Sequence, residues 1–393
     1  MWRGAVNARA AVLIMSCGAF LFCLGCRERP AGWAGTIEER DGVVVVRNPA
    51  APVHDGQVVT FEEELSIGQD TGQEEYLFAR VNGMGVDDNG HIYVIDGRDA
   101  LIRVFDGNGG FLRTIGRKGQ GPGEFEMPVH VQVTEDGELF VGDYAMRAFF
   151  FSLDGRFIRQ KAMPRPVWPV KLDSHGGLVG IEIAAPPPLG GKTIRIYDPD
   201  FKPLLVIAVE EPGARGLFDI GKPSCYCAVA SDDRIIWGDS SEYVLHVLDP
   251  QAEPVRKILK THQPQRISAS DRETYENRYA EPLKAGMKIA FRDHYPAFSG
   301  IFTDDEGRIF VRTYEKADSQ DSLLYFDVFD ADGVYLAKVL PNVNLDQRSV
   351  WKNRKLYTVE TSPEGFPVIK RHAVNWQRAG RYFDPSLTPL GPF

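Results

Sequence analysis

Cysteine is scarce in this sequence, with five residues in 393, and most of them lie near its start. Cys17, Cys23 and Cys26 fall in the first segment, so only Cys225 and Cys227 remain for a folded domain. These two alternate in the run CYCAVA, and residues i and i+2 of a strand share a face. They could be small apolar fillers of a core, or a metal or redox pair, although two cysteines alone make an incomplete zinc site.

Recognisable catalytic motifs are missing as well. We find no G-x-S-x-G, no His-Glu-x-x-His, no phosphate loop and no paired-cysteine zinc signature. The eight histidines are scattered along the chain, at His54, His91, His130, His175, His246, His262, His294 and His372. These absences favour a protein that is not an enzyme, and they predict neither a cofactor nor a bound metal.

An excess of basic residues is also absent. The chain has 45 Lys and Arg against 54 Asp and Glu, which gives a formal net charge of −9. An acidic chain without a basic run is a poor candidate for binding nucleic acid, so we expect no nucleic-acid partner.

Long hydrophobic runs are limited to one, Ala10–Leu24, which is too short to span a membrane comfortably. Arg3 and Arg9 precede it, as in a signal peptide, which we place over residues 1–25. The sequence Cys23-Leu24-Gly25-Cys26 resembles a lipobox, although Cys23 stands where Leu is usual. The resemblance implies lipidation of Cys26; an ordinary secretory signal cut nearby is the alternative.

The polar, Pro- and Gly-bearing residues 26–41 read as a tether between this anchor and the folded domain. Arg27, rather than Asp, follows the modified cysteine. We therefore expect an exported protein, held by its lipid on the periplasmic or outer-membrane face of the cell envelope.

What is abundant is a repeat, clearest from Gly83 to Pro128. Three runs rich in β-branched and aromatic residues lie in it, Ile92–Ile95, Leu101–Phe105 and Phe111–Ile115. Gly, Asp and Asn separate them, so each reads as a short strand joined by a tight turn. Related copies follow at about 47 residues, which is the period of a four-stranded propeller blade. The copies occupy residues 128–160, 167–208, 225–260 and 304–341.

The five copies do not include the strands predicted near the two ends of the chain, which could form a sixth blade together. Leu356–Val359 and Pro367–Val374 read as inner strands of a sixth blade whose outer strand is missing. Val58–Ile67 resembles that outer strand, and its addition would close the ring and hide two sheet edges. The sequence therefore predicts an all-β, six-bladed β-propeller over residues 42–393, with its last blade closed by an N-terminal strand.

The linker GQGPGEF, Gly119–Phe125, together with the pieces YVID and FLRTIG, resembles NHL repeats. Over residues 41–375 the chain is similar to bacterial six-bladed propeller lipoproteins of that type. The resemblance implies the fold but no activity, because most such proteins have none assigned and one fold hosts many functions.

Residues 263–296 interrupt the repeat with a polar, helix-favouring segment. Ser268 or Ser270 could cap a helix there, with Glu273 as the capping-box partner of Ser270. We predict one or two short helices, which could form a lid over a site or a solvated loop that covers a blade edge.

Among residues that could carry chemistry, His130 follows Pro128 on an inner strand and alternates with valines. If the valines face a neighbouring blade, His130 and Gln132 face the other side or the channel mouth. Asp143 and Asp239, like Asp96, follow the second strand of their blades, where they could cap a turn or contribute to a ring of carboxylates.

Inter-blade linkers and the turns between second and third strands share one face of a propeller. We therefore predict that a ligand binds there, with residues 263–296 as a rim or lid, at Glu124, His130, Asp143, Arg147 and Asp239. Two functions stay open. The first is a binding or scaffold module for an envelope protein, peptide or glycan. The alternative is a metal-dependent, lactonase-like hydrolase or lyase, which needs three or more ligands converging in the channel.

Overall fold

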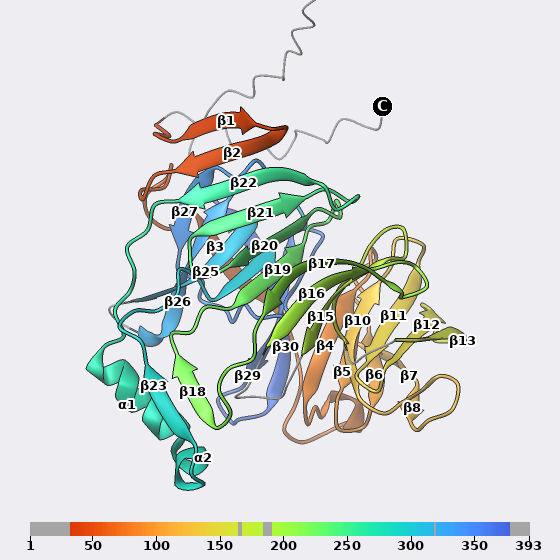
Figure 1. Cartoon of the computed structure of the whole chain (residues 1–393). Helices are drawn as coiled ribbons and strands as arrows, with labels where there is room; N and C mark the ends of the chain where they lie inside the picture. Colours follow the sequence, from red (N-terminus) through yellow and green to blue (C-terminus); the bar gives the residue numbers. More distant parts are fainter. Residues whose placement is uncertain (1–31, 164–166, 184–190, 318–319, 378–393) are drawn as a thin grey trace, which may run out of the picture.

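The computed structural model describes residues 32–163, 167–183, 191–317 and 320–377, and six of their β-sheets, each built on four antiparallel strands, are arranged around a central channel (Figure 1). Each sheet is one blade, and its first strand lies innermost. The expected six-bladed β-propeller is therefore confirmed. The predicted signal peptide and the predicted lipidation site, Cys26, lie outside the described residues.

Blades 1 to 3 each use four consecutive strands, as the repeat predicts. Blade 1 comprises β4 (Val81–Val86), β5 (Ile92–Asp96), β6 (Leu101–Phe105) and β7 (Phe111–Ile115). Blade 2 comprises β10 (Pro128–Val133), β11 (Glu138–Asp143), β12 (Arg147–Ser152) and β13 (Phe157–Ala162). Blade 3 comprises β14 (Val167–Leu172), β15 (Leu178–Ile183), β16 (Lys192–Tyr197) and β17 (Pro203–Glu210). Short connecting elements are η1 (Glu74–Tyr76), β8 (Arg117–Lys118) and β9 (Glu124–Phe125).

Blades 4 to 6 involve both ends of the chain. Blade 4 comprises β19 (Cys225–Val229), β20 (Ile235–Asp239), β21 (Val244–Leu248) and β22 (Pro254–Lys260). Blade 5 comprises β24 (Gly300–Thr303), β25 (Ile309–Ala317), β26 (Gln320–Phe329) and β27 (Tyr335–Val339). Blade 6 comprises β28 (Val350–Lys352), β29 (Lys355–Thr361), β30 (Pro367–Trp376) and β3 (Val59–Ile67).

Strand β3 closes the ring as predicted. It pairs antiparallel with β30, from Val59 opposite Trp376 to Ile67 opposite Ile369. Strand β3, which precedes blade 1 in the sequence, therefore forms the outer strand of blade 6. Val59 and Ile67 are buried, so the closure adds apolar burial to the backbone ladder.

A strand lies within residues 26–41, the predicted tether. Thr36–Arg40 form strand β1, which pairs with β2 (Val43–Asn48) in a hairpin. Strand β2 then runs parallel to β22 and extends blade 4 at its outer edge. The consecutive valines of β2 explain the difference, because Val45 and Val46 are buried there and a strand beside them satisfies the backbone.

The insertion at residues 263–296 contains the predicted helices, α1 (Ala269–Arg278) and α2 (Ala280–Lys284). Ser268 caps α1, and its capping-box partner is Asp271 rather than Glu273. The sequence pattern missed a two-stranded parallel sheet beside them, formed by β18 (Leu217–Ile220) and β23 (Lys288–Phe291). Neither helix is long and apolar enough to cross a bilayer, and the described residues contain no other α-helix.

Apolar side chains fill the spaces between neighbouring blades. Tyr93 of blade 1 and Phe149 of blade 2, for example, are fully buried in one shared cluster. The buried cluster between blades 3 and 4 is smaller and consists of Val179, Ile235 and Leu248. Each blade therefore depends on its neighbours for burial, which makes closure of the ring important for the whole domain.

Candidate ligand-binding channel

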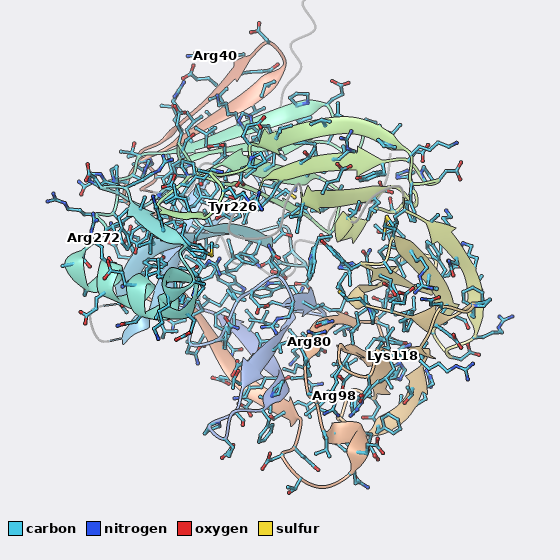
Figure 2. The ribbon with its side chains drawn as sticks, turned by 60° about the horizontal axis from the view of Figure 1, so that its bottom comes forward. Arg40, Arg80, Arg98, Lys118, Tyr226 and Arg272 are labelled. Atoms are coloured by element: carbon cyan, nitrogen blue, oxygen red, sulfur yellow. The ribbon has the colours of Figure 1, made fainter. Side chains whose placement is uncertain are left out.

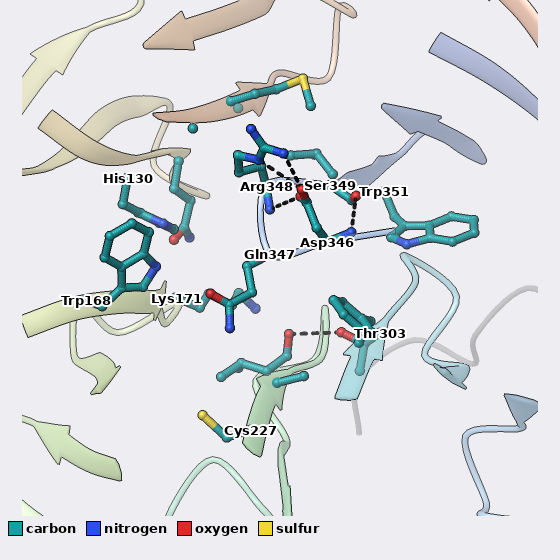
Figure 3. Close-up of a pocket in the computed structure, with 18 of the residues that line it drawn as sticks. His130, Trp168, Lys171, Cys227, Thr303, Asp346, Gln347, Arg348, Ser349 and Trp351 are labelled. Atoms are coloured by element: carbon teal, nitrogen blue, oxygen red, sulfur yellow. Dashed lines mark hydrogen bonds and ion pairs between the residues drawn. The ribbon is translucent and has the colours of Figure 1, made fainter. Parts of the chain in front are cut away.

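The first strands of the six blades surround one open channel with a volume of about 930 Å³ (Figure 3). All six start after an inter-blade linker and end at a tight turn. We call the two mouths of the channel the linker end and the turn end accordingly. The linker end is the face on which the sequence analysis predicts ligand binding.

Polar side chains tie neighbouring inner strands together around the wall. The amide of Asn82 donates to the carbonyl of Pro128 at 2.9 Å. Gln132 donates to the carbonyl of Leu172 and accepts from its N–H, both at 2.8 Å. Lys171 reaches across to Asp233 of blade 4 at 2.6 Å. These bonds satisfy strand edges that would otherwise be unpaired.

Blades 1 and 2 approach each other closely at the wall. A Cβ added at Gly83 would lie 3.1 Å from the carbonyl oxygen of Val129, and one at Gly85 would lie 3.2 Å from that of Val131. Larger residues at these two positions would push β4 away from β10. The glycines therefore help to set the width of the channel.

In blade 6 the inner strand is replaced in part by a loop. Strand β28 pairs with only the first residues of β29, and Asn344 donates to the carbonyl of Val359 further along. The chain then turns at Asp346–Ser349, where the Ser349 N–H donates to the carbonyl of Asp346 at 3.0 Å. Figure 3 shows that this turn directs the side chain of Gln347 into the open middle of the channel.

Arg348 holds this turn in place. Its Nε donates to Asp346 at 3.0 Å, and a terminal nitrogen donates to the carbonyl of Val81 on blade 1 at 3.3 Å. Gln347 itself is exposed. Sequence reasoning missed this loop; the available signal was the polar run Asp346-Gln347-Arg348-Ser349 at the place where the repeat requires an apolar inner strand.

His130 lies in the channel wall next to Trp168, which is half-buried on β14 (Figure 3). Its ring centroid is 5.8 Å from that of Phe140, while Val131 packs against blade 1. His130 therefore faces blade 3, as the alternation with valines predicts. Burial lowers the pKa of His130 to about 4, so the ring is neutral at physiological pH. Its Nε2 atom has no hydrogen-bond partner among the described residues.

Of the five residues predicted to bind a ligand, His130 lines the channel and the other four do not. Asp143 is fully buried and accepts from the N–H groups of Glu126 and Ala145, both at 2.8 Å. Arg147 lies 3.4 Å from Asp143 and 3.2 Å from Glu126. The structure thus brings Asp143 and Arg147 together at the linker face.

Glu124 and Asp239 hold other loops. Glu124 accepts from the N–H of Gly121 at 2.9 Å and pairs with Arg117 at 2.7 Å, and these contacts lower the pKa of its carboxyl. Asp239 accepts from the N–H of Ser241 at 2.8 Å. In the same way, Asp143 accepts a hydrogen bond from the N–H of Ala145, two residues further along the chain. This shared pattern agrees with the interpretation that both aspartates cap turns.

The two remaining cysteines are free thiols on β19. Burial, with the nearby Asp239 carboxylate, raises the pKa of Cys225 to about 11. Burial is the largest of the causes that raise the pKa of Cys227 to about 12. Both thiols are therefore protonated at neutral pH, whereas metals and disulfide exchange need thiolates. Cys225 is buried, as expected of an apolar filler, but Cys227 is half-buried and lines the channel. Among the described residues, no three His, Cys, Asp or Glu side chains converge on a point that could hold a metal ion.

Charge is distributed unevenly along the channel. Lining residues at the linker end include the cations Arg80, Lys192, Arg312 and Arg348. Lining residues at the turn end include the acids Glu135, Asp173, Asp304 and Asp305. Arg80 lies on the inner side of the ring, whereas Arg40 and Arg272 lie at its periphery (Figure 2). A ligand that enters at the linker end therefore meets positive charge first.

The insertion does not contribute to this channel. None of the lining residues comes from residues 263–296, all of which the structure describes. Asp271 of α1 instead forms an ion pair with Lys316 of β25. The insertion thus packs against blade 5 outside the channel lining, which does not favour the lid interpretation.

The sheets and the channel define a six-bladed β-propeller, and comparison with known proteins agrees. The model of a family described as a 6-bladed beta-propeller, DUF5128, matches residues 71–175. No curated protein matches the sequence.

Several solved structures are similar over most of the chain. A protein of Bacteroides fragilis NCTC 9343, described as a candidate exported protein, is 11% identical; the match covers 85% of this chain and 100% of that one, with a TM-score of 0.49. A DUF4221 family member from Bacteroides vulgatus is 12% identical, with 81% and 99% covered and a TM-score of 0.46. Virginiamycin B lyase from Staphylococcus aureus is 11% identical, with 80% and 99% covered and a TM-score of 0.40. Identities this low assign no function.

Proposed function

We propose that this propeller is a binding module that takes a segment of a peptide or glycan into the linker end of its channel. The observation that carries the proposal is the loop of blade 6, which presents Gln347 to the open channel that Trp168 also lines. An indole face and an exposed amide in one channel suit flat, hydroxylated or amide-bearing ligands. The lone, neutral His130 and the missing cluster of convergent ligands among the described residues support binding over catalysis.

The channel contacts can be tested by binding measurements on arrays of glycans and peptides. Trp168→Ala should weaken binding of the best ligand by about 30-fold, as expected for loss of an aromatic anchor. Gln347→Ala should weaken it by about tenfold, the loss of one or two hydrogen bonds. Gln251→Ala, on an exposed outer turn of blade 4, is the matched control and should bind like the parent. Unchanged binding by both channel variants would contradict the proposal.

We further propose that the chain is an exported, NHL-type lipoprotein anchored through Cys26. Strand β1 starts at Thr36, which leaves nine residues between Cys26 and the fold. Such a segment spans at most about 35 Å, so the lipid would hold the propeller close to the membrane surface. Cys26→Ser should release the protein from membranes or block its processing. Unchanged membrane fractionation and mass would contradict anchoring at this residue.

A further inference from the structure

Arg312 reaches the channel from β25, the second strand of blade 5, rather than from the inner strand. It lies opposite Gly300 of β24, and opposite residues on neighbouring strands project to the same side of a sheet. A Cβ added at Gly300 would lie 3.6 Å from Nη2 of Arg312 and 2.9 Å from the ring of Phe302. Because Gly300 has no side chain, the guanidinium can pass it and line the channel at the linker end.

The guanidinium of Arg312 is held in place but keeps donors free. Its Nε donates to the hydroxyl of Ser299 at 3.0 Å, and its Nη2 donates to the carbonyl of Ser299 at 2.9 Å. Ser299 is buried, so these two bonds fix the orientation of the Arg312 side chain. Among the described residues, no carboxylate forms an ion pair with Arg312 and no acceptor bonds to its Nη1. Nη1 and the second hydrogen of Nη2 are therefore available to the two oxygens of a carboxylate.

Arg80 and Arg348 add positive charge at the same end of the channel. Arg80 is exposed, donates to the carbonyl of Gly97 at 3.1 Å, and pairs with none of the described carboxylates. Asp346 is the one acidic residue among the described residues that line this end, and Arg348 already binds it at 3.0 Å. Lining cations therefore outnumber lining acids at the linker end.

Lys192, at the start of β16 in blade 3, is a further cation there. Its Nζ lies 3.8 Å from Glu210, but Nζ of Lys222 lies 3.7 Å from the same carboxylate. Glu210 cannot neutralise both lysines, and it does not line the channel. Nζ of Lys192 also lies 5.0 Å from the centroid of the Tyr226 ring, which lines the channel. The linker end therefore attracts a negatively charged polymer before contact is made.

We propose that the linker end selects acidic glycans, and that Arg312 binds the carboxylate of a uronic-acid residue. The proposal rests on the binding function proposed above and narrows its ligand to one class. A chain of uronic acids offers a ring face to Trp168, hydroxyls to the amide of Gln347 and a carboxylate to Arg312. All three side chains line the same channel.

An acidic peptide also carries carboxylates, but the channel wall suits it less well. A peptide that binds by strand addition needs free backbone groups along a strand edge. Here the amide of Asn82 already bonds to the carbonyl of Pro128, and Gln132 bonds to both backbone groups of Leu172. Recognition therefore depends on side chains that project into the channel, which favours a glycan.

Isothermal titration calorimetry with tetragalacturonate and with its methyl ester tests the proposal, because the ester keeps the rings but removes the charges. Tetragalacturonate should bind, and the ester should bind at least about tenfold more weakly. Arg312→Gln should weaken the binding of tetragalacturonate by about tenfold or more and leave the binding of the ester unchanged. Arg80→Gln changes an exposed charge and should weaken the binding of tetragalacturonate about threefold.

Lys118→Gln is the matched control. Lys118 is an exposed cation in the linker between blades 1 and 2, and it does not line the channel. This variant should bind tetragalacturonate like the parent. Circular dichroism and melting temperature verify that each variant folds, and the comparison of the acid with its ester on the parent protein needs no variant.

A parent that does not bind tetragalacturonate, or that binds the acid and the ester equally, would overturn the proposal. So would full binding by a folded Arg312→Gln variant, or tighter binding of a tetraglutamate peptide than of tetragalacturonate. A neutral glycan that depends on Trp168 and Gln347 but not on Arg312 would overturn it and leave the proposed binding function intact. Binding of tetragalacturonate that depends on Arg312 but not on Trp168 or Gln347 would support the carboxylate site and contradict the channel contacts proposed above.

Discussion

A buried ion pair joins blades 4 and 5, and its removal should be costly. Asp327 is fully buried, and Lys260 lies 3.1 Å from it with its side chain only 4% exposed. The hydroxyls of Tyr243 and Tyr335 both donate to Asp327 at 2.6 Å. The pKa of each tyrosine is raised, first by burial and then by the Asp327 charge. Lys260 also lies over both rings, at 5.0 and 4.6 Å from their centroids.

Lys260→Met keeps the length of the side chain but leaves the carboxylate of Asp327 without a cation. Leaving one buried charge unpaired costs about 3–5 kcal/mol, so we expect the free energy of unfolding to fall by that amount. Adding Asp327→Asn removes the orphaned charge and keeps one acceptor for a tyrosine hydroxyl. The double variant should therefore be about 1–2 kcal/mol less stable than the parent, which is a smaller loss than that of Lys260→Met.

Equilibrium urea unfolding, followed by tryptophan fluorescence, measures these differences. Lys202→Met is the matched control because Lys202 pairs with Asp200 at 3.5 Å on the surface, where an ion pair contributes at most about 1 kcal/mol. A loss below about 1 kcal/mol for Lys260→Met would refute the reasoning. A double variant less stable than Lys260→Met would refute it too.

Three further predictions concern the closure, the pH dependence and the thiols. Deleting residues 42–67 removes β3 and most of the outer hairpin, so the whole domain should lose its cooperative melting transition; a truncated chain that melts like the parent would show that the closure is dispensable. The pKa of His130 is about 4 in the folded protein and near 6.5 in the unfolded chain. The unfolded chain therefore binds a proton first as the pH falls below 6.5, and the free energy of unfolding should fall by up to about 3 kcal/mol by pH 4. His130→Gln should flatten the melting temperature over that pH range, and an unchanged profile would show that His130 does not cause it. Cys225 and Cys227, with pKa values of about 11 and about 12, should react only slowly with a thiol reagent at pH 8 in the native protein because little thiolate is present, although Cys227 lines the channel; rapid labelling of the native protein would contradict these raised pKa values.

The site was harder to predict than the fold. His130 was identified from its alternation with valines, because a two-residue period survives in any strand regardless of what surrounds it. Nothing in the sequence around Trp168 distinguishes an aromatic residue in the channel from one packed between blades. Gln347 gave no signal of its own, since an exposed amide in a polar run is typical of any surface loop.

The repeat determined five of the blades, and the unpaired strands near the two chain ends predicted a sixth blade closed by Val58–Ile67. Strand pairing within a blade joins residues close in sequence, so turn residues and apolar alternation are sufficient to specify it. Tertiary structure decided the rest. Whether Asp346–Ser349 continues an inner strand or enters the channel depends on contacts with Val81 and Val359 of other strands. The exposure of Leu204 and Val209 on β17, the outer strand of blade 3, likewise depends on which edges the chain ends cover, because a strand's sequence does not specify whether a neighbour lies beside it.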